Sequence, residues 1–540
     1  MPEIFSFAQQ LPDRGSMESM SDNQPSVFND VIGPVMRGAS SSHCAAALRI
    51  GRLALSMMGG QIDKVFVEFE SSGALATTHE SQGTDMGLFG GLLGWDLTDE
   101  RLLDYVAAMQ ASDIEIAIEI NDFPTTSPNI YKLTLTNAQG SHTLLADSIG
   151  GGMIEVLQIN GVPLSIAGDC HETLIFVNGE AEELRERLTQ DFAPAELHVR
   201  GDGRAVEIKA QSHLDENVRK ELLSAFPISS WMEMDQVLPV ASHAGTTLPF
   251  TSCEEMLAYN KGRGLDLWEL ALDYECIRGQ LTRDDAFDRM REIVKLLQEA
   301  VRIGLAGTEY DDRILGYQCG PFRDSLAAGT LLETGMLNEI VLQITAMMEV
   351  KSSMGVIVAA PTAGACAALP GSVLGAAKSR GQSVDDMTKA MLAAGMIGIF
   401  IATHSTFAAE KAGCQAECGA GSGMAAAALV GLAGGTLEQA LSASSMALQN
   451  MLGLICDPVA KRVEVPCLGR NVLGASNAVS CANMALAGFN AVIPLDEVIH
   501  AMDKIGRQMP CEVRCTGLGG LSVTPTSLEI ESALESKCCS

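Results

Sequence analysis

The sequence predicts an α+β N-terminal portion followed by an all-α C-terminal domain, and three observations support this division. Before about residue 226, runs such as DKVFVEFE and YKLTLT alternate apolar with polar or charged residues, which is typical of half-buried strands. After that point almost no such alternation remains. Long stretches rich in Ala, Leu, Met and Gly are instead interrupted by Gly and Pro, which indicates closely packed helices. With 540 residues, the chain is also long enough for several domains.

The N-terminal portion divides further. Residues 1–26 are polar and rich in Met and Ser, and we expect a disordered lead-in there. Residues 27–150 combine strands with helices such as CAAALRIGRLALSMM, which predicts a mixed sheet domain, and a glycine-rich break at 148–152 follows. Residues 153–225 contain five candidate strands and the helix EAEELRERLTQ, a mixture that resembles a small ACT-like module. The all-α domain is expected over residues 240–540.

Composition restricts the function classes. The formal net charge is −31, whereas binding to nucleic acid requires a surface of Lys and Arg, so we predict no nucleic-acid partner. The same charge disfavours anionic membrane surfaces. The most membrane-like run, Met391–Thr403, is too short to span a bilayer and fits a buried helix, so no membrane association is expected. The 15 cysteines are an odd number, and the first residues lack a basic start followed by an apolar stretch, so we predict a cytoplasmic location.

Three cysteines in the C-terminal half form the most informative pattern. Cys414, Cys456 and Cys467 occur in AGCQAE, LICDP and VEVPCLGRN, separated by 42 and 11 residues. Neither a disulfide-rich fold nor a CxxC zinc knuckle uses this spacing. Three widely spaced thiolates suit a [4Fe–4S] cluster with one iron free of cysteine, and such an iron is a Lewis acid. Taken singly, each cysteine is better interpreted as a buried structural thiol.

The segment AAPTAGACAALPG is rich in small residues and breaks the helical pattern. Its backbone N–H groups can form a nest for a carboxylate, with Thr362, Ala363 and Gly364 as the candidate contacts. A tight turn between two helices is an equally good interpretation from the residues alone.

Three serines and a histidine, Ser40 to His43, open a predicted helix. Hydroxyl residues at such positions are usually caps, so the run by itself favours a local structural role. A role in a site depends on the family comparison that follows.

Seven segments resemble, in order, the motifs of the iron–sulfur L-serine dehydratases (L-serine ammonia-lyases), and the likeness covers nearly the whole chain. They are VIGPVMRGASSSHCAAALRIGR, ALATTHESQGTDMGLFGGLLG, DSIGGGMIEV, MGVIVAAPTAGACAALPG, AGCQAE, LICDPVAKRVEVPCLGRN and TGLGGLSVTPT. The resemblance implies fused β and α portions, with a substrate-binding-like β domain at 27–150 and an all-α catalytic domain. It also implies a [4Fe–4S] cluster on Cys414, Cys456 and Cys467. The expected reaction converts L-serine to pyruvate and ammonia by abstraction of the α-proton and Lewis-acid-assisted loss of hydroxide.

The resemblance also implies individual site residues. Ser41, Ser42 and His43 are expected to face the substrate, with His43 as a proton carrier or an orienting group. In the loop HESQGTD, the resemblance makes Thr84 and Asp85 substrate-binding candidates.

Several positions depart from the family pattern. Gln82 replaces a histidine of the loop, and an amide cannot accept the proton as a base, so His79, three residues earlier, is the candidate replacement. Cys515 replaces a glutamate near the C-terminus, Cys44 a threonine and Ala39 a proline. These changes favour retained elimination chemistry with an altered substrate or base. Threonine, another 3-hydroxy amino acid, cysteine desulfidation and a slow or inactive enzyme remain open.

Three further expectations follow from the family. Cys538 or Cys539 can fold back as a tail ligand of the free iron, although a frayed terminus is at least as good an interpretation. The ACT-like module can bind an amino acid and regulate, or merely hold domains together. Relatives suggest a homodimer.

Two other readings compete. A pyridoxal-phosphate (PLP) enzyme requires a Schiff-base lysine beside a glycine-rich phosphate cup, and no lysine between Lys351 and Lys504 has such a setting, so we predict no PLP. A non-catalytic metal or amino-acid sensor would use the cysteines for structural zinc. Metal content separates the cluster-dependent dehydratase from the sensor: iron with sulfide supports the dehydratase, and zinc supports the sensor.

Overall fold

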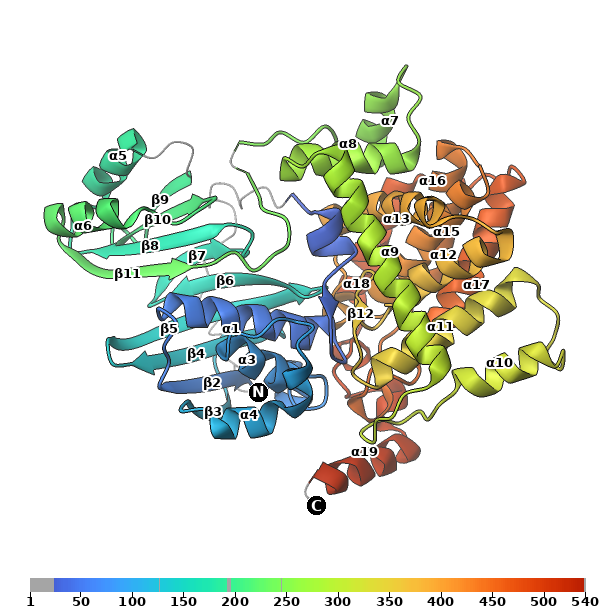
Figure 1. Cartoon of the computed structure of the whole chain (residues 1–540), viewed down its shortest axis with the longest axis horizontal. Helices are drawn as coiled ribbons and strands as arrows, with labels where there is room; N and C mark the ends of the chain where they lie inside the picture. The colour runs from blue at the N-terminus through green and yellow to red at the C-terminus, as the bar shows by residue number, and fades with distance from the viewer. Residues whose placement is uncertain (1–23, 126, 192–195, 244, 539–540) are drawn as a thin grey trace, which may run out of the picture.

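The computed structural model describes residues 24–125, 127–191, 196–243 and 245–538, and side chains within these ranges except those of Asp191 and residues 535–538. Figure 1 shows a sheet-rich part built from the N-terminal half beside a helical part built from the C-terminal half. The predicted α+β portion followed by a helical portion is therefore confirmed in outline.

The first part is built on a six-stranded sheet of order β3-β2-β4-β5-β6-β7. Only β2 and β3 run parallel, and all other neighbours are antiparallel. Helices α1 and α3 pack together and bury their apolar faces with the sheet's alternating apolar residues. The elements are α1 (Ala46–Met57), β2 (Lys64–Glu70), α2 (Leu75–Thr78), α3 (Thr84–Leu92), α4 (Tyr105–Ala111), β3 (Glu115–Asn121), β4 (Ile130–Asn137), β5 (Gly140–Gly150), β6 (Met153–Ile159) and β7 (Val162–Ile166).

A second, four-stranded antiparallel sheet follows, of order β11-β8-β10-β9. Its elements are β8 (His171–Val177), α5 (Ala181–Asp191), β9 (Glu196–Arg200), β10 (Ala205–Ala210), α6 (Glu216–Ala225) and β11 (Ile228–Met234). The succession β-α-β-β-α-β with this strand order is the split, ferredoxin-like arrangement. Residues such as Leu184, Val206 and Leu222 give it a core of its own.

The position of this unit differs from the expected module at 153–225. Strands β6 and β7 pair with β5 in the six-stranded sheet, so the sheet continues across the expected boundary between 150 and 153. The glycines at 150–152 form a tight hairpin and not a domain linker. The unit extends instead to β11, whose sequence ISSWMEM has no clean alternation of apolar and polar residues.

The second part is helical. Helix α15 is almost wholly buried, and α12, α13, α16 and α17 pack around it. Small residues allow this density: a Cβ on Gly375 of α12 would lie 2.7 Å from the Cα of Ile340 in α11. The helices are α7 (Cys253–Asn260), α8 (Leu267–Gly279), α9 (Arg283–Ala306), α10 (Cys319–Ala327), α11 (Met336–Ser352), α12 (Ala368–Arg380), α13 (Val384–His404), α14 (Ala409–Ala412), α15 (Ala420–Leu432), α16 (Leu437–Met451), α17 (Cys467–Leu486), α18 (Leu495–Gln508) and α19 (Pro525–Cys538).

Helix α13 contains the apolar run singled out in the sequence. Among the described residues it is the one helix long and apolar enough to cross a membrane, and 78% of its most apolar window is buried inside the protein. Ser383 caps its start, with Asp386 completing a capping box. Its position among other helices fits the expected core helix.

The two parts are joined through a short antiparallel pair, β1 (Val35–Met36) with β12 (Ile357–Val358). The predicted lead-in, 1–26, needs one correction, because its last residues are ordered. Tyr274 donates a hydrogen bond to the carbonyl of Pro25, and Ser26 caps the turn Val27–Val31. The rest of that lead-in, residues 1–23, lies outside the described residues.

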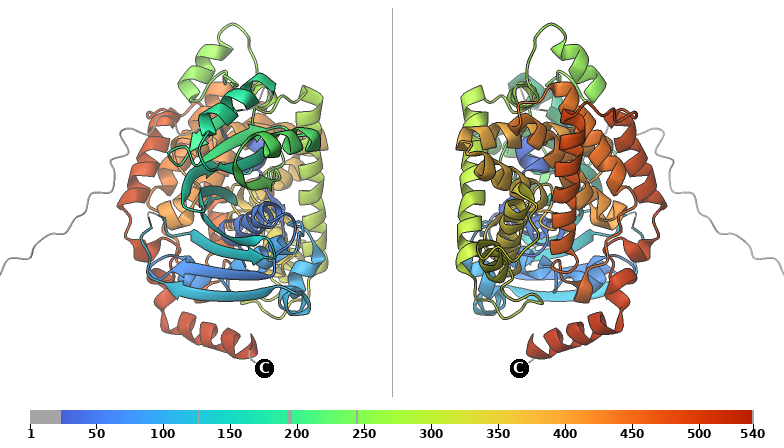
Figure 2. Two further views of the ribbon diagram at one scale, coloured as in Figure 1. Left: turned by 90° about the vertical axis from the view of Figure 1, so that its left-hand side faces the viewer. Right: turned by 90° about the vertical axis from the view of Figure 1, so that its right-hand side faces the viewer.

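Helix α19 ends the described chain at the periphery, as both views of Figure 2 show. Cys538 is its last residue, and its side chain is outside the described part, as is all of Cys539. The tail-ligand expectation therefore stays a prediction.

Candidate active site

The three cysteines of the sequence pattern converge in the helical part. Cys414 precedes a π-helical turn that leads into α15, Cys456 lies in an extended segment, and Cys467 is the first residue of α17. All three are buried. The charge of Cys414 acts on both Cys456 and Cys467, so the three sulfurs share one neighbourhood. Cys418 and Cys515 pack in the same buried cluster as Cys414 and Cys456.

Local sequence explains these positions. Gly413 has φ +70°, and a Cβ there would lie 2.7 Å from the Sδ of Met509, so only glycine fits before Cys414. The Cys456 segment is fixed by a hydrogen bond from its own N–H to the carbonyl of Val513 (2.8 Å). Cys467 lies at a helix N-terminus, where the dipole favours a thiolate.

Asn471, which the sequence analysis did not single out, ties the cysteines to the AAPTAG segment. Its Oδ1 accepts from the N–H groups of Ala367 and Ala368 (3.1 and 2.8 Å). Its Nδ2 donates to the carbonyls of Gly364 and Cys467, both at 2.8 Å. One turn of α17 separates Asn471 from Cys467, so the motif VEVPCLGRN contained this signal.

Two cations lie near the thiols. Burial raises the pKa of the Cys467 thiol, and the charge of Lys351 opposes that shift. Lys351 is itself buried and donates to the carbonyl of Val463. Arg470 pairs with Asp457 at 2.6 Å and interacts with Cys414 and Cys456. Three buried thiols compensated by two cations are a donor set that fits an anionic iron–sulfur cluster.

The AAPTAG segment is partly occupied by protein groups. Ala363 N–H donates to the hydroxyl of Ser41 at 3.1 Å, which brings together two predicted site residues from the two parts of the chain. The hydroxyl of Thr362 donates to Oε1 of Glu417 at 2.7 Å. Among the described residues, the N–H groups of Thr362 and Gly364 have no acceptor. A Cβ on Gly364 would lie 3.0 Å from Oε1 of Glu417, so a side chain there would crowd this carboxylate.

His43 is fully buried and held on both ring nitrogens. Nδ1 lies 3.0 Å from the hydroxyl of Ser40, and Nε2 lies 2.9 Å from that of Thr78. Thr78 gives its proton to the carbonyl of Ala74 at 2.6 Å, so Nε2 of His43 is the donor in their contact. Burial lowers the pKa of His43 to about 3. The imidazole is therefore neutral, and its geometry suits an orienting group better than a proton carrier. The carbonyl of its neighbour Ser42 accepts from the hydroxyl of Ser148 at 2.7 Å.

His79 and Asp85 form a dyad at the start of α3. Nδ1 of His79 lies 2.9 Å from each oxygen of the Asp85 carboxylate. Burial lowers the pKa of His79, but the hydrogen bond and the charge of Asp85 raise it more, so its pKa lies above the usual value. Among the described residues, Nε2 of His79 makes no hydrogen bond, which leaves its lone pair available as a base.

Buried polar atoms without partners gather around the same loop. Four buried polar atoms make no hydrogen bond among the described residues: both amide atoms of Gln82 and the hydroxyls of Thr84 and Tyr131. Gln82 lies beside Cys515, close enough to affect its pKa, so these two departures from the family pattern are neighbours. Buried polar groups are normally paired, so a cluster of unpaired ones points to a bound polar molecule.

Glu410 is a functional candidate that sequence reasoning missed. Its Oε1 lies 3.8 Å from Nδ1 of His43, and its Oε2 has no partner among the described residues. Burial raises its pKa to about 7. Its position four residues before Cys414 in the sequence was the available signal.

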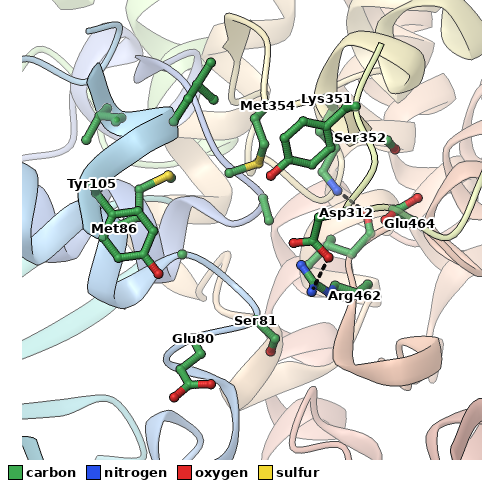
Figure 3. Close-up of a pocket in the computed structure, with 16 residues that line it drawn as sticks. Glu80, Ser81, Met86, Tyr105, Asp312, Lys351, Ser352, Met354, Arg462 and Glu464 are labelled. Atoms are coloured by element: carbon green, nitrogen blue, oxygen red, sulfur yellow. Dashed lines mark hydrogen bonds and ion pairs between the residues drawn. The ribbon is translucent and has the colours of Figure 1, made fainter. Parts of the chain in front are cut away.

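A pocket of about 100 Å³ opens between the two parts of the chain. Figure 3 shows Glu80 and Ser81 on one side and Lys351, Arg462 and Glu464 on the other. The three cysteines do not line it, but its walls include the residues next to Gln82 on one side and residues shortly before Cys467 on the other.

Comparisons with known proteins agree with this arrangement. The family model "Serine dehydratase alpha chain" matches residues 262–522. A "Probable L-serine dehydratase, alpha chain" of Bacillus subtilis (strain 168) is 38% identical over 285 residues, 53% of this chain and 95% of that protein. The "L-serine dehydratase, alpha chain" of Peptoniphilus asaccharolyticus is 35% identical over 282 residues, 52% of this chain and 96% of that protein.

The N-terminal part has its own match. A "Probable L-serine dehydratase, beta chain" of Bacillus subtilis (strain 168) is 40% identical over 155 residues, 29% of this chain and 69% of that protein. The sheet-rich part and the helical part meet at one polar site. These matches identify that arrangement as the fold of a lyase. The chain belongs to the L-serine dehydratase family, with its alpha and beta portions fused in one polypeptide.

Proposed function

We propose that this protein converts L-serine to pyruvate and ammonia, using a [4Fe–4S] cluster held by Cys414, Cys456 and Cys467. One observation carries the proposal: the three buried cysteines of the helical part share a neighbourhood with Cys515, which lies beside the unpaired amide of Gln82 among the described residues. When bound, a cluster with one iron free of cysteine supplies a Lewis acid that assists the loss of the substrate hydroxyl.

The chain's own residues supply the proton transfers. Nε2 of His79 takes the α-proton of serine, while Asp85 fixes the opposite ring nitrogen and stabilises the imidazolium. Glu410, with a pKa near neutrality, delivers a proton toward the departing hydroxyl through its free Oε2. Loss of the proton and hydroxide leaves an enamine, which becomes an imine. Water then hydrolyses the imine to pyruvate and ammonia.

Other residues bind and orient the substrate. The N–H groups of Thr362 and Gly364 are available for its carboxylate. Ser41 holds the segment that carries them through its contact with Ala363, and His43 holds Thr78 at the start of the loop. The amide of Gln82 and the hydroxyl of Thr84, both unpaired among the residues that the structure describes, are available to the substrate's polar atoms.

The experiment that tests this function begins with anaerobic purification. Iron, sulfide and zinc are measured, the visible spectrum is recorded, and 2-oxo acid formation is assayed with L-serine, L-threonine and L-cysteine. We expect about four iron and four sulfide per chain and pyruvate from L-serine. Cys456→Ser should lose iron and activity together. Cys481→Ser, a buried thiol far along α17, should keep both.

The outcomes separate the alternatives. A brown protein that acts on L-threonine or L-cysteine but not on L-serine would retain the cluster and change the substrate. The exchanges at Gln82 and Cys515 give that outcome its structural basis. A colourless protein that contains zinc would contradict the cluster.

Regulation is a separate part of the proposal. The compact β-α-β-β-α-β unit at residues 171–234 is the candidate for the ACT-like module, and we propose a regulatory role for it. An amino acid that changes the serine saturation curve without being consumed would support this role, and a curve that no amino acid alters would contradict it. A homodimer in the cytoplasm remains our expectation, and the molecular mass in solution tests the first half of it.

A further inference from the structure

A cluster of three side chains lies outside the active site, at one end of the four-stranded sheet. His171 is the first residue of β8, His213 follows the end of β10, and Asp235 follows the end of β11. Strand β8 lies between β11 and β10 and runs antiparallel to both. The start of β8 therefore lies beside the ends of β10 and β11, at the same end of the sheet. The fold therefore brings three potential metal ligands, separated by more than 20 residues, to one point.

Three ligand atoms of this cluster face one another. Nε2 of His213 lies 3.2 Å from Nδ1 of His171 and 3.0 Å from Oδ1 of Asp235. The remaining pair, Nδ1 of His171 and Oδ1 of Asp235, is 3.5 Å apart. The imidazole rings are nearly perpendicular, with an interplanar angle of 77°.

Hydrogen bonds alone do not satisfy the three ligand atoms of this cluster. If both imidazoles donate to Asp235, two N–H groups face each other across 3.2 Å. If only one donates, the lone pair of the other faces the carboxylate. A divalent cation at the centre would instead accept all three lone pairs as ligands.

The dimensions match a tetrahedral metal. Zinc with bonds of about 2.0–2.1 Å holds its ligand atoms about 3.3 Å apart. The distances here, 3.0, 3.2 and 3.5 Å, lie around that value. With three protein ligands, the fourth position falls to water, and the largely exposed side chain of Asp235 leaves that position open to solvent.

Neighbouring groups hold the ligands in the required orientation. The hydroxyl of Thr173 lies 3.4 Å from Nδ1 of His213, so this nitrogen can carry the proton and leave Nε2 for a metal. Ser56 donates to the second oxygen of Asp235 at 3.2 Å and accepts from its N–H at 3.0 Å. Such partners on metal ligands are the usual outer support of a built site.

We propose that His171, His213 and Asp235 form a site for a zinc-type divalent transition metal. Ser56 belongs to α1, so the metal would fasten the four-stranded sheet to this helix. The turn that leads directly into α1 contains Ser41, Ser42 and His43, so occupancy of the site connects the module to the active site. This proposal is independent of the reaction proposed above.

The test uses the full-length, cluster-loaded protein under anaerobic conditions, with Co²⁺ as the spectroscopic probe and Zn²⁺ as its competitor. We expect one Co²⁺ per chain with the visible d–d bands of tetrahedral nitrogen and oxygen ligation, displaced by Zn²⁺. His213→Ala and Asp235→Asn should each weaken binding at least about 10-fold without changing the iron content. His198→Ala is the matched control, because this histidine lies on β9 of the same sheet but outside the cluster.

Three results would overturn the proposal. One is equal Co²⁺ binding by the wild type and both cluster variants. Another is absence of Co²⁺ or Zn²⁺ binding at millimolar metal. The third is a bound Co²⁺ spectrum dominated by thiolate charge transfer, which would assign the metal to cysteine. Should His213→Ala fail to fold, Asp235→Asn still decides, because it keeps the size of the side chain at a largely exposed position.

Discussion

Nδ1 of His79 lies equidistant, at 2.9 Å, from the two carboxylate oxygens of Asp85. The relationship is built into one loop, because the carbonyl of His79 accepts the backbone N–H groups of Thr84 (2.9 Å) and Asp85 (3.3 Å). Gly83 makes the turn possible with φ +90°. The loop thus supplies the histidine and the carboxylate that orients it.

Asp85→Asn should disable the proposed base. Asp85 raises the pKa of His79, and only neutral imidazole accepts a proton, so wild-type kcat/KM should rise with pH through that pKa. Without the carboxylate, the rise should move to lower pH, and the plateau should fall by about 10²–10⁴-fold because the tautomer is no longer fixed. The measurement is kcat/KM against pH from 5.5 to 9.

Asp96→Asn is the control for this substitution, because it removes an exposed carboxylate paired with Arg52. Its profile should match that of the wild type. An Asp85→Asn profile that coincides with the wild type would exclude the dyad from proton transfer.

Much of the fold could be predicted because it depends on local patterns. The strands that cover a core on one face alternate in sequence, as in β4, where Tyr131, Leu133 and Leu135 are buried. Which strands join which sheet could not be predicted. The assignment of β6 to the first sheet depends on its pairing with β5, and a hairpin and a linker both use consecutive glycines.

The candidate site divides in the same way. Cys414, Cys456 and Cys467 were recognisable because metal ligation requires particular residue types in a recognisable context. Glu410 was not, because a glutamate is ordinary in sequence and becomes distinctive only through burial. The neutrality of His43 likewise results from enclosure by Ser40 and Thr78, which only the three-dimensional structure shows.

Gln82→Leu should separate stability from binding. The Gln82 amide is buried, and neither of its atoms is paired within the described part of the chain, so replacing it with an apolar side chain of similar size should stabilise the substrate-free enzyme by about 1–3 kcal/mol. If the amide binds substrate, KM should rise by about 5- to 150-fold. Urea unfolding and steady-state kinetics give the two quantities. A variant with unchanged KM would mean that Gln82 does not contact the substrate. Ser81→Ala, at the neighbouring and less buried position, is the control.

Glu410→Gln should change how stability depends on pH. Burial raises the pKa of Glu410 from 4.5 to about 7, so the folded protein retains a proton that the unfolded chain releases. The free energy of unfolding of the wild type should therefore fall as pH rises from 4.5 to 7, by at most about 3 kcal/mol from this group. Glutamine does not ionise, so the difference between variant and wild type should grow across this window. Asp30 and Asp147 also have raised pKa values, and taking the difference cancels them. A constant difference would contradict the assignment.

Lys351→Met should weaken retention of the cluster. Lys351 is buried, donates to the carbonyl of Val463 four residues before Cys467, and lowers the pKa of that thiol. Methionine fills similar space without the charge, so the thiolate of Cys467 would lose its compensating cation. We expect iron to be released to a chelator about 10- to 100-fold faster, followed by loss of the visible absorption under anaerobic conditions. Lys378→Met, which removes an exposed lysine paired with Glu339 on the surface, should release iron at the wild-type rate. Equal release rates in both variants would show that the charge of Lys351 does not stabilise the cluster. An unchanged circular dichroism spectrum would confirm that both variants are folded.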